Sequence, residues 1–429
     1  MSIPTHNLYD FIYQVTKKQF NLLYFFPFGY KDVSNLIMYD EHQPECAKLA
    51  KQDLRGSEIF KENSKFFTRT RLRNAYQPVL LCHDQEPLCF DLYQGADQYR
   101  SLYSDSEIDK LYHSKDFNIR WKLPENYQQS WIILHSELNS GALAKYESTG
   151  MFVGAYYWSH AFLSLDWYRF AKYDKSLVPN SDNEKHFLIY CRATSGSRNY
   201  RKLFLEKLQT EGMYTKCQVG SFNYRDAHSD LSATYDAYDI RNTDFHLILE
   251  TVFDERIHLT EKTCRALATG HPFFLAAGTN SLELLRYYGF KTFSPWIDES
   301  YDKETDSCAR IEKIIYSMKK YSNQPDSDRK AILKSCQKIA QYNKKHFFSD
   351  AFYKNNLDEL TTNIEKAFRK INNQFDFDRY FKNHDKQSKN LNPDLQNRTK
   401  SSQCLIEHDF FSHLKKGGTV EDYVPPDLN

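Results

Sequence analysis

Carboxylates and imidazoles gather directly after apolar runs in the first half of the chain. They are His83, Asp84, Glu86, His135, Glu137 and His160. A carboxylate or a neutral imidazole can remove the proton of an attacking hydroxyl group. Asp84, Glu86 and Glu137 are therefore candidate general bases, and Glu86 or Asp84 is favoured. The alternatives are that these acids cap the segments that follow them and that His160 is a core histidine.

Cations occupy the equivalent positions in the second half of the chain. They are Arg192, Arg198, Arg201 and Lys262, and they are accompanied by Glu250, Thr260 and Glu261. Arginine and lysine neutralise the negative charge that builds on a departing diphosphate. An acid/base side that faces a cationic side suits the transfer of a group from a diphosphate donor to a hydroxyl. As an alternative, the arginines are solvated charges, and Thr260 and Glu261 only cap a helix.

Other nucleotide and metal motifs are missing from the sequence. It has no Walker A sequence and no GxGxxG, so it carries neither of the usual motifs for binding ATP or a dinucleotide. Asp298, Glu299 and Asp302 resemble an acidic metal-binding cluster, although a surface loop is the favoured interpretation. We expect a reaction that needs neither a metal nor a cofactor.

A family resemblance rests on the segment that surrounds Lys262. Glu250-Thr251 ends an apolar run, Thr260-Glu261-Lys262 opens a helix that ends at Gly270, and the apolar run His271-Pro272-Phe273-Phe274 follows. Together with Ser197-Arg198-Asn199, this order resembles the donor-binding half of the fucosyltransferase-like glycosyltransferases. The resemblance covers about residues 186–300. It implies a GT-B fold, in which two Rossmann-like domains face each other and the C-terminal one holds the nucleotide sugar.

The resemblance also implies roles for individual residues. Lys262 and Arg198 would contact the donor diphosphate, Glu261 would lie near the ribose or the sugar, and Glu250 would bind the nucleotide or sugar. Arg192 and Thr260 complete the expected donor site. Thr251 stands where the family usually has asparagine, so the donor base and sugar stay open. The chain also looks like uncharacterised glycosyltransferase-like proteins of viruses and phages, on segments such as HDQEP at 83–87.

The apolar runs alternate with polar turns and helical spacing, which is typical of parallel sheets covered on both faces. In the first half we expect strands at 20–28, 78–82, 131–135 and 152–158 and helices that end near 150 and 170. In the second half we expect strands at 186–191, 245–250, 271–277 and 290–293. Helices are expected at 199–210, 260–269 and 281–288, and the chain from 306 onward has helical spacing.

The predicted class is therefore α/β, GT-B-like, with two facing Rossmann-like domains and a helical extension. The expected units are an acceptor domain at 1–175, a nucleotide-sugar domain at 186–305, helices at 306–372 and a polar, flexible tail at 373–429. The polar stretch 174–185 contains a cluster of turn residues and is interpreted as the linker between the two domains.

Composition narrows the class of protein. The 429 residues carry a net charge of +1, so a strongly basic nucleic-acid coat protein is excluded, although a local basic groove is not. The mean hydropathy is −0.70. Nine scattered cysteines without a CxxC pair favour reduced thiols in the cytoplasm, and the cytoplasm of a virus-infected host is one such setting. Neither a signal peptide nor a membrane span is expected.

The function predicted from these observations is an inverting, metal-independent glycosyltransferase. Its partners would be a nucleotide-diphosphate sugar and a hydroxyl acceptor on a glycan or on modified DNA. Two alternatives stay open. One is a nucleic-acid-binding or DNA-modifying protein, favoured by the lysines and arginines between 319 and 400 and by the many tyrosines and phenylalanines. The other is an inert scaffold that binds sugar nucleotides.

Overall fold

A computed structural model gives the structure of most of the second half of the chain and of shorter stretches elsewhere. It describes residues 12, 21–25, 36–38, 79–83, 131–148, 152–191, 194, 198–219, 235–371, 410, 413–414 and 416–425. The protein is an α/β protein in which each half contributes one sheet. This confirms the predicted α/β class and its parallel sheets.

The first sheet has the strand order β2-β1-β3-β4-β5. Only β2 runs antiparallel to its neighbour, and the pairs β1–β3, β3–β4 and β4–β5 are parallel. The carboxyl ends of β1, β3, β4 and β5 therefore lie along one edge. The strands are β1 (Asn21–Phe25), β2 (Leu36–Met38), β3 (Val79–His83), β4 (Trp131–His135) and β5 (Phe152–Tyr156).

The second sheet has the order β7-β6-β8-β9 and is parallel throughout. All residues of the central strand β8 are buried, as expected for a strand that is paired on both sides and covered on both faces. The strands are β6 (Lys185–Ile189), β7 (Cys217–Val219), β8 (Thr243–Leu249) and β9 (Phe273–Ala276).

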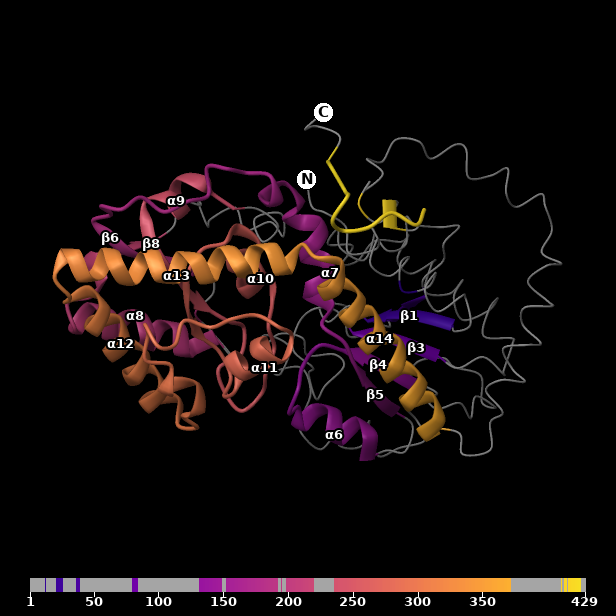
Figure 1. The fold of residues 1–429 in the computed structure, drawn as a ribbon. Coiled ribbons are helices and arrows are strands. Elements are labelled where there is room, and N and C mark those ends of the chain that lie inside the picture. The colour runs from indigo at the N-terminus through magenta and orange to yellow at the C-terminus, as the bar shows by residue number, and fades with distance from the viewer. Residues whose placement is uncertain are drawn as a thin grey trace, which may run out of the picture.

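Helices cover both sheets (Figure 1). Those that follow the strands are α6 (Gly141–Ser148), α7 (Ser159–Trp167), η2 (Arg169–Lys172), α8 (Asn199–Thr210), η4 (Tyr214–Lys216), α9 (Ala237–Arg241), α10 (Glu261–Thr269), α11 (Ser281–Tyr287) and η6 (Ser300–Lys303). The predicted helical extension is confirmed as α12 (Ser307–Ser322), α13 (Asp326–Phe347) and α14 (Asp350–Ile371). No helix of the described residues is long and apolar enough to cross a membrane.

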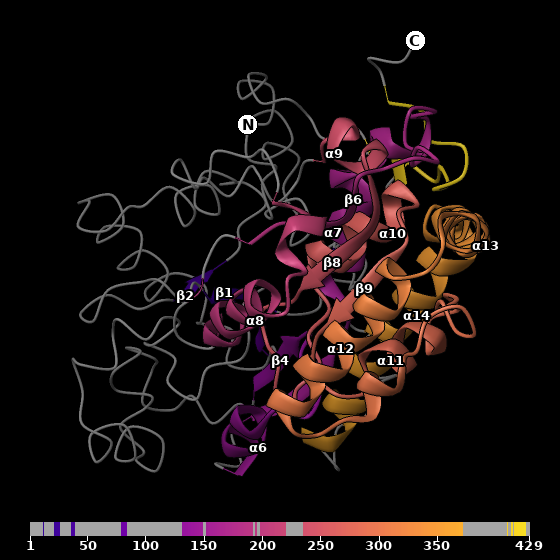
Figure 2. The same cartoon turned by 90° about the vertical axis from the view of Figure 1, so that its left-hand side faces the viewer.

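The last two long helices join the halves. Helix α13 lies along the second half beside α10, and after a bend α14 lies against β4 and β5 of the first sheet (Figures 1 and 2). The Asn363 side chain on α14 donates a hydrogen bond to the carbonyl of Tyr156, at the end of β5, over 2.9 Å. The C-terminal helix thus covers a sheet that the first half of the chain builds.

The carboxyl edge of the first sheet also meets the second half directly. Leu138, shortly after β4, forms an antiparallel β-bridge with Ile257 in the loop after β8. The indole of Trp158, after β5, donates to the carbonyl of Leu259 over 2.9 Å. Trp158 is 1% exposed, so its indole ring belongs to the core of the protein. The loops that follow strands in both sheets therefore share one junction.

Most of the predicted strands coincide with observed ones, but the prediction of a strand at 290–293 is wrong. These residues are irregular, because the amides of Phe293 and Ser294 donate to the carboxylate of Glu299 and not to a neighbouring strand. The helix expected to reach Phe170 divides into α7 and η2. The short strands β2 and β7 were not predicted.

Part of the predicted flexible tail is packed. Between 416 and 425, Val420 and Tyr423 are buried, and the ammonium of Lys172 donates to the carbonyl of Val420 over 2.9 Å. The hydroxyl of Tyr173 donates to the carbonyl of Tyr423. Residues 416–425 therefore dock on η2 and the residue after it, in place of the flexibility that their polar composition suggested.

A buried carboxylate at the start of β8 makes the stability of the protein depend on pH. Asp244 is 2% exposed and accepts hydrogen bonds from Tyr321 (2.9 Å) and Asn183 (3.2 Å). Burial raises its pKa from 3.8 to about 6, which the two hydrogen bonds and nearby Arg329 only partly oppose. The folded protein therefore holds this proton more tightly than the unfolded chain does.

We expect the contribution of Asp244 to the free energy of unfolding to be greatest below pH 4 and to fall as the pH rises to about 6. The loss amounts to about 3 kcal/mol, since one pKa unit corresponds to about 1.4 kcal/mol. Urea unfolding between pH 4 and 7 measures this fall. The variant Asp244→Asn should show a flatter profile, and an unchanged profile would contradict the assignment.

Candidate functional site

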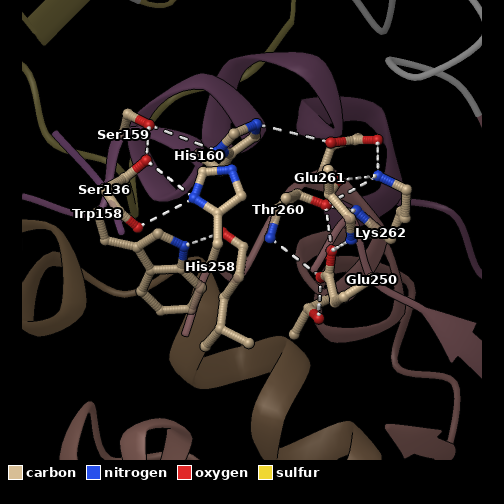
Figure 3. Close-up of polar contacts among 12 residues, drawn as sticks. Ser136, Trp158, Ser159, His160, Glu250, His258, Thr260, Glu261 and Lys262 are labelled. Carbon is tan, nitrogen blue, oxygen red and sulfur yellow. Dashed lines mark hydrogen bonds and ion pairs between the residues drawn. The ribbon is translucent and has the colours of Figure 1, made fainter. Parts of the chain in front are cut away.

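The centre of the candidate site is the carboxylate of Glu250, directly after β8. Its side chain is fully buried. One carboxylate oxygen accepts from the amide of Thr260 (3.0 Å) and the hydroxyl of Thr263 (2.6 Å). The other accepts from the hydroxyl of Thr260 (2.5 Å) and the amide of Thr251 (3.3 Å) (Figure 3). Four donors offset the cost of burying this charge and fix the loop 251–259 against α10.

Local sequence explains where α10 begins and ends. The hydroxyl of Thr260 accepts from the amide of Lys262, so Thr260 is the N-cap of the helix. Gly270 ends the helix in the left-handed region with φ of 66°, a conformation that glycine adopts without steric cost. Both ends agree with the prediction. Helix α10 therefore begins at the carboxyl edge of the second sheet, where the helix dipole favours an anion.

Lys262 places an ammonium group at this edge. Its Nζ lies 3.1 Å from the hydroxyl of Thr260, 3.4 Å from that of Thr251 and 2.7 Å from a carboxylate oxygen of Glu261 (Figure 3). The side chain of Lys262 is 21% exposed, so the ammonium is only partly covered. The hydroxyl of Thr251, at the position where the resembled family has asparagine, thus contacts the lysine of the predicted donor site.

Glu261 carries a negative charge between two partners. One carboxylate oxygen contacts Lys262, and the other lies 3.6 Å from Nε2 of His160 on α7. Burial alone would raise the pKa of Glu261, but Lys262, His160 and Arg265 outweigh it and hold the pKa well below its usual value. The contact with His160 joins α10 of the second half to α7 of the first.

Two histidines and two serines line the junction beside this carboxylate. The Nδ1 of His258 donates to the carbonyl of Ser136 over 3.1 Å. The hydroxyl of Ser159 donates to that of Ser136 over 3.0 Å and lies 3.4 Å from Nδ1 of His160. The imidazole rings of His160 and His258 meet edge to face, with 5.4 Å between their centres. These side chains form a buried polar layer between the two halves, as Figure 3 shows.

The amino end of α8 lies against the same strand end. The guanidinium of Arg201 donates to the carbonyls of Leu249 (2.9 Å) and Glu250 (2.7 Å), and the hydroxyl of Tyr200 also donates to Glu250 (2.5 Å). Arg201 is buried, so it positions the strand end and is not a solvated charge. Arg198 directly precedes α8 and is half-buried, which places it near this edge as well.

Glu137 lies on the opposite side of the junction, two residues after β4. Its carboxylate is 1% exposed and lies 3.7 Å from the guanidinium of Arg256. Burial raises the pKa of Glu137, and Arg256 opposes this only in part. The carbonyl of Glu137 accepts from Nδ1 of His135 over 2.9 Å. A carboxylate with a raised pKa is suited to acid–base chemistry. The role of Glu137 as a general base stays a prediction.

The structure brings together part of the predicted site. Glu250, Thr260, Glu261 and Lys262 form one connected cluster. The four hydrogen bonds of the Glu250 carboxylate are all made within the protein, so Glu250 positions Thr260 at the site. Direct contact between Glu250 and a ligand stays a prediction. The predicted residues Asp84, Glu86 and Arg192 lie outside the described residues.

Sequence reasoning missed His258, whereas it considered His160 both as a candidate site residue and as a core histidine. One signal was available, because Ile257, His258, Leu259 and Thr260 alternate apolar and polar residues. This pattern predicts an extended segment with one buried side. The partner of His258 is Ser136, however, and a separation of 122 residues leaves no local pattern.

The acidic cluster near residue 300 serves the local fold. Asp302 accepts from the amide of Leu282 (2.9 Å), and Asp298 accepts from that of Ser300 (3.0 Å). Glu299 accepts from the amides of Phe293 and Ser294. Within the part of the chain that the structure describes, no group of three or more His, Cys, Asp or Glu side chains is placed to hold a metal ion.

Fold and site together define an α/β protein with two mainly parallel sheets and, at a strand end, a threonine-rich cluster that contains Lys262 and the carboxylates of Glu250 and Glu261. No family model, no curated protein and no solved structure matches the chain.

Proposed function

We propose that this protein is a glycosyltransferase that moves a sugar from a nucleotide-diphosphate donor to a hydroxyl acceptor. The observation that supports it is the position of Lys262. Its partly exposed ammonium lies at the first turn of α10, beside the end of β8, where it contacts two threonine hydroxyls and the carboxylate of Glu261. The carboxyl edge of a parallel sheet is where α/β proteins bind ligands, and a helix N-terminus with a lysine favours a phosphate.

The proposal includes a GT-B arrangement of the two halves. It draws support from the way in which loops after β4 and β5 meet the loop after β8. A donor at the second sheet and an acceptor at the first would then share one cleft. Closure of such a cleft excludes water and keeps the donor from being hydrolysed.

In the proposed reaction an acceptor hydroxyl attacks the anomeric carbon of the donor sugar and forms the new carbon–oxygen bond. The bond between that carbon and the diphosphate oxygen breaks, and the electron pair leaves with the diphosphate. Lys262, Arg198 and Arg192 stabilise this charge. A carboxylate of the first half, Glu86, Asp84 or Glu137, takes the hydroxyl proton. An inverted anomeric centre is the expected outcome of this single displacement.

Slow hydrolysis of the donor tests the proposal without knowledge of the acceptor. The full-length protein is incubated with sugar nucleotides of each common base, and the released nucleoside diphosphate is measured. We expect release above the protein-free blank with one class of donor. Binding without release would indicate a sugar-nucleotide scaffold and not an enzyme. Neither binding nor release with any donor would contradict the proposal.

A further inference from the structure

A second candidate binding region lies away from the strand end that carries Lys262. A cavity of about 900 Å³ opens between the segment 290–300, the end of α12 and the middle of α13. Its wall includes Lys291, Trp296, Lys320 and Ile339. Trp296 is 47% exposed, whereas Trp158 and Trp167 are buried. A large aromatic side chain that lines a cavity and stays half-exposed is a typical contact surface for a planar ligand.

The outer side of α13 continues this cavity wall with lysines and a tyrosine. Lys338 and Lys345 lie four residues before and three residues after Tyr342, so the three side chains are neighbours on the helix surface. Nζ of Lys291 lies 4.1 Å from the centre of the Tyr342 ring. This contact links the surface of α13 to the cavity. We name Lys291, Trp296, Lys320, Lys338, Tyr342 and Lys345 together the basic–aromatic face.

The lysines of this face are available for an anion. Lys320, Lys338 and Lys345 are exposed, and none of them forms an ion pair with another described residue. Figures 1 and 2 place α13 on the outer side of the second half. The chain as a whole carries a net charge of only +1, so this gathering of cations is local.

The carboxylates that face the cavity are Asp298 and Glu299. Glu299 is held by Arg286 over 3.3 Å and by the amides of Phe293 and Ser294. Asp298 accepts from the amide of Ser300. Arg286 and Glu299 largely offset each other. Asp298 then remains as one carboxylate of the cavity wall against the four lysines of the basic–aromatic face. The region therefore keeps an excess of positive charge.

We propose that the basic–aromatic face binds single-stranded nucleic acid. Bases would stack on Trp296, and phosphates would contact Lys320, Lys338 and Lys345. Aromatic platforms flanked by cations are the common means of holding single strands, because every base has a face that can stack. A duplex hides those faces and would use only the lysines. This binding region is independent of the proposed transfer reaction at the strand end.

The test is fluorescence anisotropy of a labelled oligothymidine of roughly 15 nucleotides, which spans a typical single-strand site. Trp296→Ala should weaken binding by the full-length protein about tenfold, the scale for losing one stacked base. Trp296→Phe keeps a ring and should bind nearly as well as the wild-type protein, so loss of the ring is separable from misfolding. Tyr238→Ala removes an exposed aromatic side chain on α9 and should leave binding unchanged.

The salt dependence of the dissociation constant tests the lysines. Each of Lys338→Ala and Lys345→Ala should reduce the slope of log affinity against log salt by about 0.7, the value for one phosphate contact of a single strand. Lys366→Ala on α14, at a similarly exposed lysine, should leave the slope unchanged. No binding of the oligonucleotide at low salt would overturn the proposal. The proposal would also be overturned if heparin bound as tightly as the oligonucleotide and Trp296→Ala did not change the binding of heparin. That result would indicate a surface that binds any polyanion.

Discussion

Replacing Lys262 with alanine is expected to slow the release of nucleoside diphosphate from a sugar nucleotide by roughly 10²–10³-fold, the scale for one transition-state charge contact. The ammonium lies at the first turn of α10, where the carboxylate of Glu261 and the hydroxyls of Thr251 and Thr260 fix its position. Its removal would leave the charge that builds on the leaving diphosphate without this cation. Steady-state rates of donor hydrolysis measure the effect.

Two variants accompany this measurement. Arg198→Ala should lower the rate on a similar scale, because Arg198 precedes α8 at the same edge of the sheet. Lys366→Ala removes an exposed lysine on α14 and should leave the rate unchanged. Near-normal rates in both the Lys262→Ala and the Arg198→Ala proteins would contradict the assignment of the donor site.

Replacing Glu250 with alanine is expected to lower the free energy of unfolding by about 3–5 kcal/mol, the range for losing one partner of a buried charged network. The carboxylate accepts from Thr251, Thr260 and Thr263. Without it, the donors of these threonines would stay buried with no acceptor, and the loop 251–259 would lose its link to α10. Urea unfolding measures the loss, and hydrogen exchange locates it in the loop and the first turn of α10.

Glu255→Ala is the matched control, because Glu255 lies in the same loop but is exposed. Substitutions of exposed side chains usually change stability by less than about 0.5 kcal/mol. Equal stability of the Glu250→Ala and wild-type proteins would show that the loop does not depend on the carboxylate. Unchanged hydrogen exchange in the amides of Thr251 and Thr260 would lead to the same conclusion.

Local signals in the sequence were sufficient for several elements. The helix 199–210 and the strand 131–135 agree with their predicted bounds. In each segment the apolar residues follow a single hydrophobic pattern, and turn residues flank that pattern. Helix α10 was predicted from Thr260 at its start and Gly270 after its end, and the structure gives these residues those roles. A capping hydroxyl and a glycine at positive φ act on the nearest residues, so a sequence reveals them directly.

Contacts between distant segments escaped prediction. Glu250 was expected at a ligand, but the three threonines that surround it lie up to 13 residues further along the chain. His258 and Ser136 come from different halves, so neither predicts the other. At 290–293 the aromatic residues suggested a strand, whereas the backbone amides there are used by Glu299. Strand propensity is a property of the residue type, whereas packing decides which group accepts the hydrogen bond of its backbone amide.

A thermal-shift screen of the full-length protein against nucleoside diphosphates and sugar nucleotides tests the central claim most directly. A ligand at a hundredfold excess over its dissociation constant stabilises the folded protein by about 2.7 kcal/mol. We predict a rise in melting temperature with one nucleoside diphosphate, which is lost in the Lys262→Ala protein and kept in the Lys366→Ala protein. No shift with any of these ligands, or an equal shift in the Lys262→Ala protein, would contradict a donor site at the end of β8.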